Sequence, residues 1–223
     1  MSKILQNSTD LKIVIVGNSG VGKTSFVKQW TKGIFSDDYK ATILSEFSYK
    51  IFEYKGKYYK IQFWDIAGQD KNIYTSKVFT KNAHGCILLS DLTNPETLKV
   101  TIKWKNSIDE NSRFIDGDYL PSLLVQNKVD LITDDNLKEP TEEVKKFANE
   151  NGYLSVLNAS AKTGEGVDIA MDYLIKTIID RLEEYSKKTN KPINNDNRTS
   201  IVIEQPKKSN ESLLKSNKCC NYV

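Results

Sequence analysis

Cysteine is scarce in this sequence, with three among 223 residues. Cys86 lies in an apolar run and is expected to be an inert core residue, whereas Cys219 and Cys220 stand side by side near the end. Three cysteines, no signal peptide and no apolar run of the roughly 20 residues that a membrane-spanning helix needs argue against a disulfide scaffold and a transmembrane helix. The sequence therefore predicts a cytosolic globular protein.

A strong overall charge is also missing, because 32 basic residues oppose 29 acidic ones and leave a net charge of +3. The positive excess is concentrated from Ser186 onward, where eight Lys and Arg residues stand against three acids. This segment lacks the interleaved aromatic residues typical of nucleic-acid binding, so no nucleic-acid partner is expected. A cytoplasmic membrane surface is the better partner, because each nearby basic residue adds roughly 1 kcal/mol of attraction to anionic lipid.

Length and periodicity predict one α/β domain. We expect a short N-terminal extension at 1–9, the domain at 10–185, and a flexible tail at 186–223 that has too few apolar residues to pack. Alternating elements predict a six-stranded, mostly parallel sheet with one antiparallel edge strand, flanked by about five helices. The expected strands are Leu11–Val16, Phe47–Tyr54, Lys57–Trp64, Gly85–Leu89, Leu123–Val125 and Leu154–Leu157. The expected helices include Lys23–Lys32, Pro95–Asn111, Thr141–Asn151 and Gly166–Tyr185.

A glycine-rich loop directly follows the first expected strand. It begins at Gly17 and ends in Lys23-Thr24, which is the P-loop pattern. Backbone N–H groups and the dipole of the following helix would bind di- or triphosphate, with Lys23 on the β- and γ-phosphates and Thr24 on Mg²⁺. The motif alone leaves ATP and GTP undistinguished, and an ordinary turn before a helix is the alternative. The predicted phosphate-binding residues are Gly17, Asn18, Ser19, Gly20, Val21, Gly22, Lys23, Thr24 and Ser25.

Two later segments would recognise the base of the nucleotide. Asn127, Lys128 and Asp130 follow a buried strand, so they lie at the sheet edge where open α/β sheets bind ligands. A carboxylate there accepts two hydrogen bonds from guanine, and adenine would leave it unpaired, a loss that discriminates by roughly 10⁴–10⁵. The segment Ser160, Ala161 and Lys162 would offer the Ala161 N–H to guanine O6. Together these segments predict a guanine nucleotide.

The segments between the P-loop and the two base-binding segments would sense the γ-phosphate. Asp65 is placed to hold Mg²⁺ through water, Gly68 to donate its N–H to the γ-phosphate, and Gln69 to orient the attacking water. Thr42 is the natural second hydroxyl ligand of Mg²⁺. Phe35 would pack edge-on against guanine, although an ordinary core position is the alternative.

With these motifs in this order, residues 10–185 resemble a small GTPase of the Ras superfamily and, within it, the Rab family. Position 2 is Ser, which argues against an Arf protein, and no insertion of the Rho type follows Asp130. Ile66 and the run Val100–Asn106 resemble the Rab branch of lysosome-related organelles and phagosomes.

The resemblance implies partners and a site for them. An exchange factor, a GTPase-activating protein, effectors, a prenylation escort and a GDP-dissociation inhibitor are expected, and the protein itself is expected to be a monomer. Phe47, Trp64 and Phe79 match the aromatic positions at which Rab effectors dock, with core packing as the alternative. Leu44 and the run Asp70-Lys71-Asn72 depart from the usual Rab switch sequences, which puts common contacts there in doubt.

The paired cysteines near the end predict a lipid anchor. Cys220 satisfies a C-terminal prenylation box, and Cys219 beside it is similar to Rab ends in which both cysteines carry geranylgeranyl groups. Two lipid chains anchor stably where one is marginal. The protein is thus expected on the cytoplasmic face of an intracellular membrane, cycling through the cytosol in vesicle trafficking.

The chain has three arginines, Arg113, Arg181 and Arg198, and motif order places none of them at the γ-phosphate. Slow intrinsic hydrolysis is therefore expected, with an activating protein supplying the arginine finger. The alternative is a membrane-anchored module that holds nucleotide without cycling, but the intact Thr42, Asp65 and Gln69 favour turnover.

Overall fold

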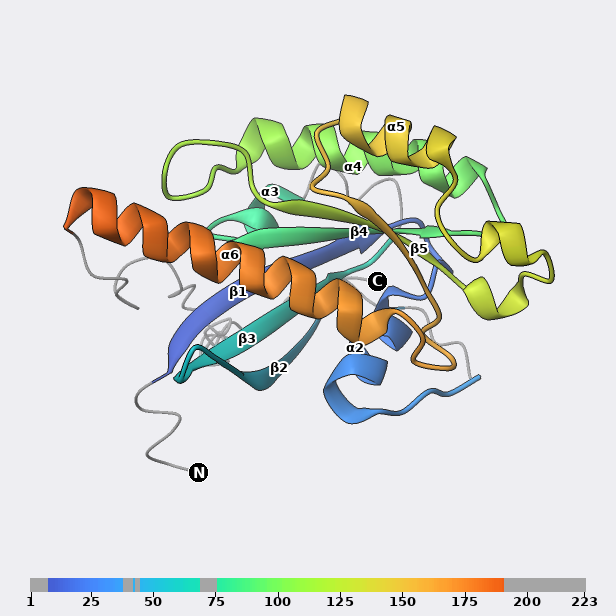
Figure 1. Ribbon diagram of the computed structural model, residues 1–223, viewed down its shortest axis with the longest axis horizontal. Coiled ribbons are helices and arrows are strands. Elements are labelled where there is room, and N and C mark those ends of the chain that lie inside the picture. Colours follow the sequence, from blue (N-terminus) through green and yellow to red (C-terminus); the bar gives the residue numbers. More distant parts are fainter. Residues whose placement is uncertain (1–7, 38–41, 43–44, 69–75, 191–223) are drawn as a thin grey trace, which may run out of the picture.

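The computed structural model describes residues 8–37, 42, 45–68 and 76–190, and these form one sheet covered by helices on both faces (Figure 1). Six strands lie in the order β2-β3-β1-β4-β5-β6. Strands β2 and β3 are antiparallel, and every other neighbouring pair is parallel. The predicted sheet, with its antiparallel edge strand, is confirmed.

Five of the six strands, β1 to β5, are longer than the runs that predicted them, because ladder pairing continues into polar residues at their ends. Their bounds are β1 Thr9–Gly17, β2 Ser45–Tyr54, β3 Lys57–Ile66, β4 Gly85–Asp91, β5 Ser122–Asn127 and β6 Val156–Ala159. Strand β6 begins two residues later than predicted, since Leu154 pairs with Ser122 through a single hydrogen bond and remains partly exposed.

The α-helices of the described residues are α2 Lys23–Lys32, α3 Ser76–Thr80, α4 Glu96–Asn111, α5 Glu142–Glu150 and α6 Val167–Thr189. Helices α2 and α6 cover one face of the sheet, and α3, α4 and α5 cover the other (Figure 1). Pro95 and Thr141 are N-caps rather than first helical residues. Helix α6 continues past the predicted end at Tyr185 and stops at Asn190, which adopts a left-handed backbone with φ 53°.

The core lies on both sides of the central strands. Strand β4 is buried along its whole length, and β1 from Leu11 onward, as the apolar runs predicted. Trp104 of α4 and Ile178 of α6 are fully buried on opposite faces. The two long helices α4 and α6 are thereby fixed against opposite faces of the sheet.

Candidate nucleotide-binding site

A pocket of about 580 Å³ opens at the edge where the parallel strands end. The loops after β1, β3, β5 and β6 all reach it, because the carboxyl ends of parallel strands meet at one edge. The predicted nucleotide-binding residues that line it are Ser19, Gly20, Gly22, Lys23, Thr24, Ser25, Phe35, Thr42, Gly68, Asn127, Lys128, Asp130, Ala161 and Lys162. The remaining predicted ones in the described part, Gly17, Asn18, Val21 and Ser160, lie behind this lining and hydrogen-bond to it.

Two glycines let the P-loop approach its neighbours. Gly17 has φ 142°, and a Cβ there would lie 2.2 Å from the Leu89 carbonyl oxygen of the adjacent strand. Gly22 has φ 94°, and its Cβ would lie 2.4 Å from Asn127 Nδ2. A side chain at Gly17 would push the loop away from β4, and one at Gly22 would push it away from Asn127 at the base end of the pocket.

Lys23 is buried inside the loop that it closes. Its Nζ donates to the carbonyl oxygens of Gly17 at 3.0 Å and Asn18 at 2.8 Å. Burial lowers the pKa of Lys23 to about 8, with the nearby Asp65 carboxylate opposing the shift. An ammonium held this way is already desolvated and faces the pocket, which suits a phosphate as its next partner.

Three oxygen-bearing side chains gather beside Lys23. Thr24 Oγ1 lies 2.9 Å from Thr42 Oγ1 and donates to Asp65 Oδ2. Asp65 is 2% exposed, and burial raises its pKa to about 6. Its other oxygen, Oδ1, is buried and has no hydrogen-bond partner among the described residues. A buried carboxylate with an unused oxygen beside two hydroxyls fits a hard cation such as Mg²⁺.

At the base end, Asn127 ties two loops together. Its Nδ2 donates to the Val21 carbonyl at 2.8 Å, and its Oδ1 accepts from the Ala161 N–H at 2.9 Å. The Ala161 N–H expected to face guanine O6 is therefore engaged by Asn127 in this structure. Ser160 Oγ donates to Asp130 Oδ1 at 2.6 Å, which orients that carboxylate.

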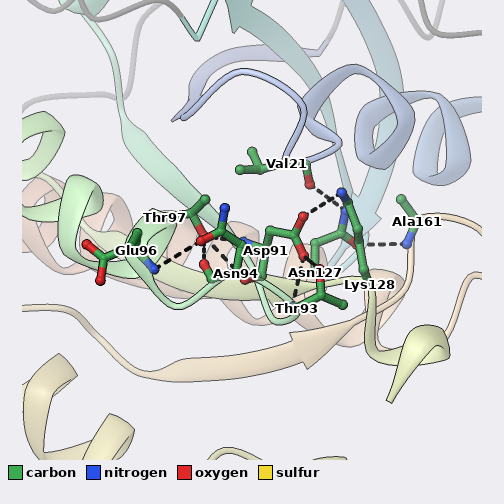
Figure 2. A network of polar contacts seen from close by, with 9 residues as sticks. All are labelled: Val21, Asp91, Thr93, Asn94, Glu96, Thr97, Asn127, Lys128 and Ala161. Atoms are coloured by element: carbon green, nitrogen blue, oxygen red, sulfur yellow. Dashed lines mark hydrogen bonds and ion pairs between the residues drawn. The ribbon is translucent and has the colours of Figure 1, made fainter. Parts of the chain in front are cut away.

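One residue of this region was not anticipated from the sequence. Asp91 ends β4, and its Oδ2 lies 2.5 Å from Lys128 Nζ (Figure 2). It could have been found by the rule that located Asn127, since both residues end a buried parallel strand at the same edge.

The predicted effector residues form an aromatic cluster away from the pocket. Trp64 lies with its ring centroid 5.7 Å from that of Phe47 and 6.4 Å from that of Phe79. Phe47 is 51% exposed, so the core alternative does not describe it. Lys12 is buried beneath the cluster, with Nζ 4.4 Å from the Trp64 ring centroid. Phe35 is also partly exposed and lines the pocket instead of the core.

Two of the three arginines lie at the opposite edge of the sheet from the phosphate loop. Arg181 pairs with Asp116 and Asp118 of the loop after α4, and Arg113 stacks over Tyr119 of the same loop. This loop precedes β5, so it lies at the amino ends of the strands (Figure 1). Gln69, Leu44, the run 70–72, Arg198, Cys219 and Cys220 lie outside the described residues.

A P-loop, a threonine–aspartate cluster and an Asn-Lys-x-Asp segment around one pocket define a P-loop nucleotide-binding protein. The Ras family model matches residues 12–180, and the chain belongs to this family. It is accordingly a small GTPase, a hydrolase of GTP that binds GTP and GDP. Exchange factors, activating proteins and effectors regulate this family in general.

Several Rab proteins are similar to this chain. Ras-related protein Rab-32 from Sus scrofa is 29% identical over 202 residues, which cover 90% of this chain and 86% of that protein. Rab-32C from Dictyostelium discoideum is 32% identical over 179 residues, covering 80% and 78%. Rab-7L1 from Mus musculus is 29% identical over 174 residues, covering 78% and 84%. The chain is thus Rab-like, as the sequence motifs predicted. Among the described residues, no helix has the length and apolar character to span a bilayer.

Proposed function

We propose that this protein is a membrane-anchored switch that cycles between GDP and GTP forms and recruits effectors in intracellular vesicle trafficking. Its Rab-like sequence supports this assignment, and so do the basic residues of the tail and the adjacent Cys219 and Cys220. The single observation that carries the proposal is the pocket itself. The groups that we assign to phosphate, Mg²⁺ and the base converge on it, most of them from the loops after β1, β3, β5 and β6.

At the phosphate end, Lys23 would bind the β- and γ-phosphates, together with backbone N–H groups from Gly17 to Ser25. Thr24 and Thr42 would hold Mg²⁺ through their hydroxyls, and Asp65 through water. When bound, the metal would neutralise charge on the phosphates. The partnerless Asp65 Oδ1 supports this role. Gly68 would donate its N–H to the γ-phosphate, because its lack of a Cβ lets it lie against Lys23 Nζ and the Asn18 backbone.

At the base end, Asp130 would accept hydrogen bonds from the guanine N1–H and 2-amino groups. Ser160 supports this role, because its hydroxyl donates a hydrogen bond to Asp130 Oδ1 and so restrains the carboxylate. Phe35 and Lys128 line the same end of the pocket and would flank the base. The Asn127 side chain, which hydrogen-bonds to Val21 and Ala161, would hold the base end of the pocket next to the P-loop.

Hydrolysis would be slow without a partner. Gln69 would orient the attacking water, and an activating protein would supply an arginine. The positions of Arg113 and Arg181 at the amino ends of the strands support this expectation. Loss of the γ-phosphate would release Thr42 and Gly68, so the segments around them would relax and effectors would dissociate.

The tail would carry the anchor. Geranylgeranyl groups on Cys219 and Cys220 would hold the protein on the cytoplasmic face of an organelle membrane, with basic residues of the tail adding attraction to anionic lipid. A prenylation escort and a GDP-dissociation inhibitor would return it through the cytosol. Ile66 and the run Val100–Asn106 support the branch of lysosome-related organelles and phagosomes.

Single-turnover GTP hydrolysis tests the switch. The wild-type protein should hydrolyse bound GTP slowly, and Gln69→Leu should hydrolyse it markedly more slowly still. Gln62→Leu is the matched control, because Gln62 hydrogen-bonds Asp10 on the sheet and lies outside the pocket lining. Equal and negligible rates in all three proteins would instead favour a nucleotide-holding module that does not cycle.

Base recognition and anchoring need separate measurements. Asp130→Asn should shift nucleotide preference from guanine to xanthine, and an unchanged preference would contradict the assignment of Asp130. Replacing Cys219 and Cys220 with Ser should release the protein from membranes of cells that prenylate it, without changing its affinity for GDP. Continued membrane association of that double variant would contradict the lipid anchor.

A further inference from the structure

We infer that Asp91 is a positioning residue of the base-binding end, where its carboxylate fixes the Lys128 side chain before a nucleotide enters. This inference rests on the proposed function, because it adds a residue to the same site. Asp91 does not line the pocket, whereas Lys128 does. Asp91 would therefore act on the nucleotide through Lys128.

The sheet brings the two residues together. Strands β4 and β5 run parallel with Asp91 paired to Asn127, so the residue after Asn127 emerges beside the Asp91 side chain. The Leu92 N–H donates to the Asn127 carbonyl at 2.9 Å and keeps the two chains together beyond the end of β4. Figure 2 shows Asp91 and Lys128 pointing toward each other, next to the Asn127 bridge to Val21 and Ala161.

The Asp91 carboxylate divides its two oxygens between different partners. Oδ1 accepts from the Thr93 N–H at 2.9 Å and from Thr93 Oγ1 at 2.6 Å, while Oδ2 faces Lys128 Nζ at 2.5 Å. Burial raises the pKa of Asp91, but the Lys128 ammonium and the Thr93 donors more than offset this, so the pKa lies below its usual value. The carboxylate is therefore charged at neutral pH and can rotate little.

The backbone on both sides of the pair is also constrained. The Asp91 N–H donates to Thr97 Oγ1 at 2.8 Å, at the start of α4. Lys128 has φ 73°, a left-handed conformation that costs energy in a residue with a Cβ. An ion pair that holds the end of such a residue in place removes the conformational freedom that nucleotide binding would otherwise have to remove.

Among the residues that the structure describes, Asp91 is the ion-pair partner of Lys128 Nζ, and the Lys128 side chain is 31% exposed. Removing the Asp91 charge would leave this ammonium partly desolvated and mobile. The nucleotide would then be expected to dissociate faster, because the pocket wall that covers its base end is less ordered.

Dissociation of a fluorescent GDP analogue from the full chain, with Mg²⁺ present, tests the role of Asp91. Asp91→Asn keeps an acceptor for Thr93 but removes the charge, and should raise the dissociation rate by about 5- to 30-fold. Asp116→Asn is the matched control, since it removes an equally ion-paired carboxylate at the amino ends of the strands. The GDP analogue should dissociate from Asp116→Asn at the wild-type rate.

A double-mutant cycle shows whether Asp91 acts through Lys128. Lys128→Met should raise the rate by itself, and adding Asp91→Asn to it should raise the rate no further. A wild-type rate for Asp91→Asn would overturn the inference, and so would an equal increase in the Lys128→Met background. Should Asp91→Asn not fold, Asp91→Glu retains the charge at a shifted position, and should give a smaller increase that again disappears without Lys128.

The Asp130→Asn protein separates this inference from the proposed function. If Asp130→Asn prefers xanthine nucleotides while Asp91→Asn releases GDP normally, base recognition stands and the role of Asp91 is refuted. If Asp130→Asn keeps its preference for guanine, the proposed base recognition fails, whatever the rate of Asp91→Asn.

Discussion

Replacing Asn127 with Ala should both destabilise the fold and release the nucleotide. Asn127 is 1% exposed, and its amide joins the Val21 carbonyl to the Ala161 N–H across 2.8 Å and 2.9 Å. Val21 and Ala161 are themselves buried, so Asn127→Ala would leave one acceptor and one donor without partners. Each buried unsatisfied group costs about 1–3 kcal/mol. The expected loss of unfolding free energy is therefore about 2–6 kcal/mol, towards the lower end if water enters.

This loss would be large against the 5–15 kcal/mol that typically stabilises a domain. Urea unfolding should be followed with excess GDP and again with nucleotide removed, because a bound ligand adds its own stabilisation. A larger loss in the presence of GDP would show that the bridge also serves binding. GDP dissociation, measured on the same samples, should accelerate.

Asn158→Ala is the matched control for this prediction. Asn158 of β6 donates from Nδ2 to the Leu137 and Lys138 carbonyls at 3.0 Å each, but these contacts are exposed and lie outside the pocket. Water can replace them, so we expect a smaller loss of stability and a normal dissociation rate. The reasoning is refuted if the two alanine variants unfold alike and both hold GDP as the wild type does.

Three further predictions concern Lys12, the metal site and a surface cluster. Burial lowers the pKa of Lys12 from 10.5 to about 8, so folding favours its neutral form. The penalty is present below the folded pKa and is relieved from about pH 8 to pH 10.5, so wild-type stability relative to Lys12→Met should rise across this window by at most about 3 kcal/mol in urea titrations. Asp65→Asn should weaken Mg²⁺ binding roughly 10- to 100-fold, so chelation should accelerate GDP release less than in the wild type. Glu183→Gln removes ion pairs with the exposed Lys55 at 3.2 Å and the exposed Lys57 at 2.9 Å. It should lower the free energy of unfolding by less than about 1 kcal/mol, and by less still in high salt.

Each of these has an outcome that contradicts it. A pH-independent difference between Lys12→Met and the wild type would show that Lys12 keeps its ordinary pKa. An undiminished effect of chelation in Asp65→Asn would remove Asp65 from the metal site. A salt-insensitive loss of several kcal/mol in Glu183→Gln would show that Glu183 acts through packing rather than charge.

Sequence alone could locate the site because its signals are local. The P-loop needs only glycines at fixed offsets and a strand before them, and the Asn127 segment needs only a buried strand that ends there. The rule that parallel strands end at one edge then places the segments together without any knowledge of distances. The sheet followed in the same way from alternating apolar runs.

Boundaries were less accessible, because capping and pairing decide them rather than periodicity. Helix α6 stops where Asn190 takes a left-handed backbone, past the end that its apolar pattern indicated. Strand β6 starts at Val156, because Leu154 and Ser155 each make one hydrogen bond to β5 and the paired ladder begins only at Val156.

The sequence by itself determined that the P-loop, Asp65 and the Asn127 segment share one sheet edge. Only the tertiary structure decided which partner each polar group takes: Ala161 N–H bonds Asn127, Lys128 pairs with Asp91, and Lys12 lies under Trp64. The physical reason is that these partners are distant in the chain. Several donors and acceptors compete within hydrogen-bonding range, and packing of the strands and loops selects among them.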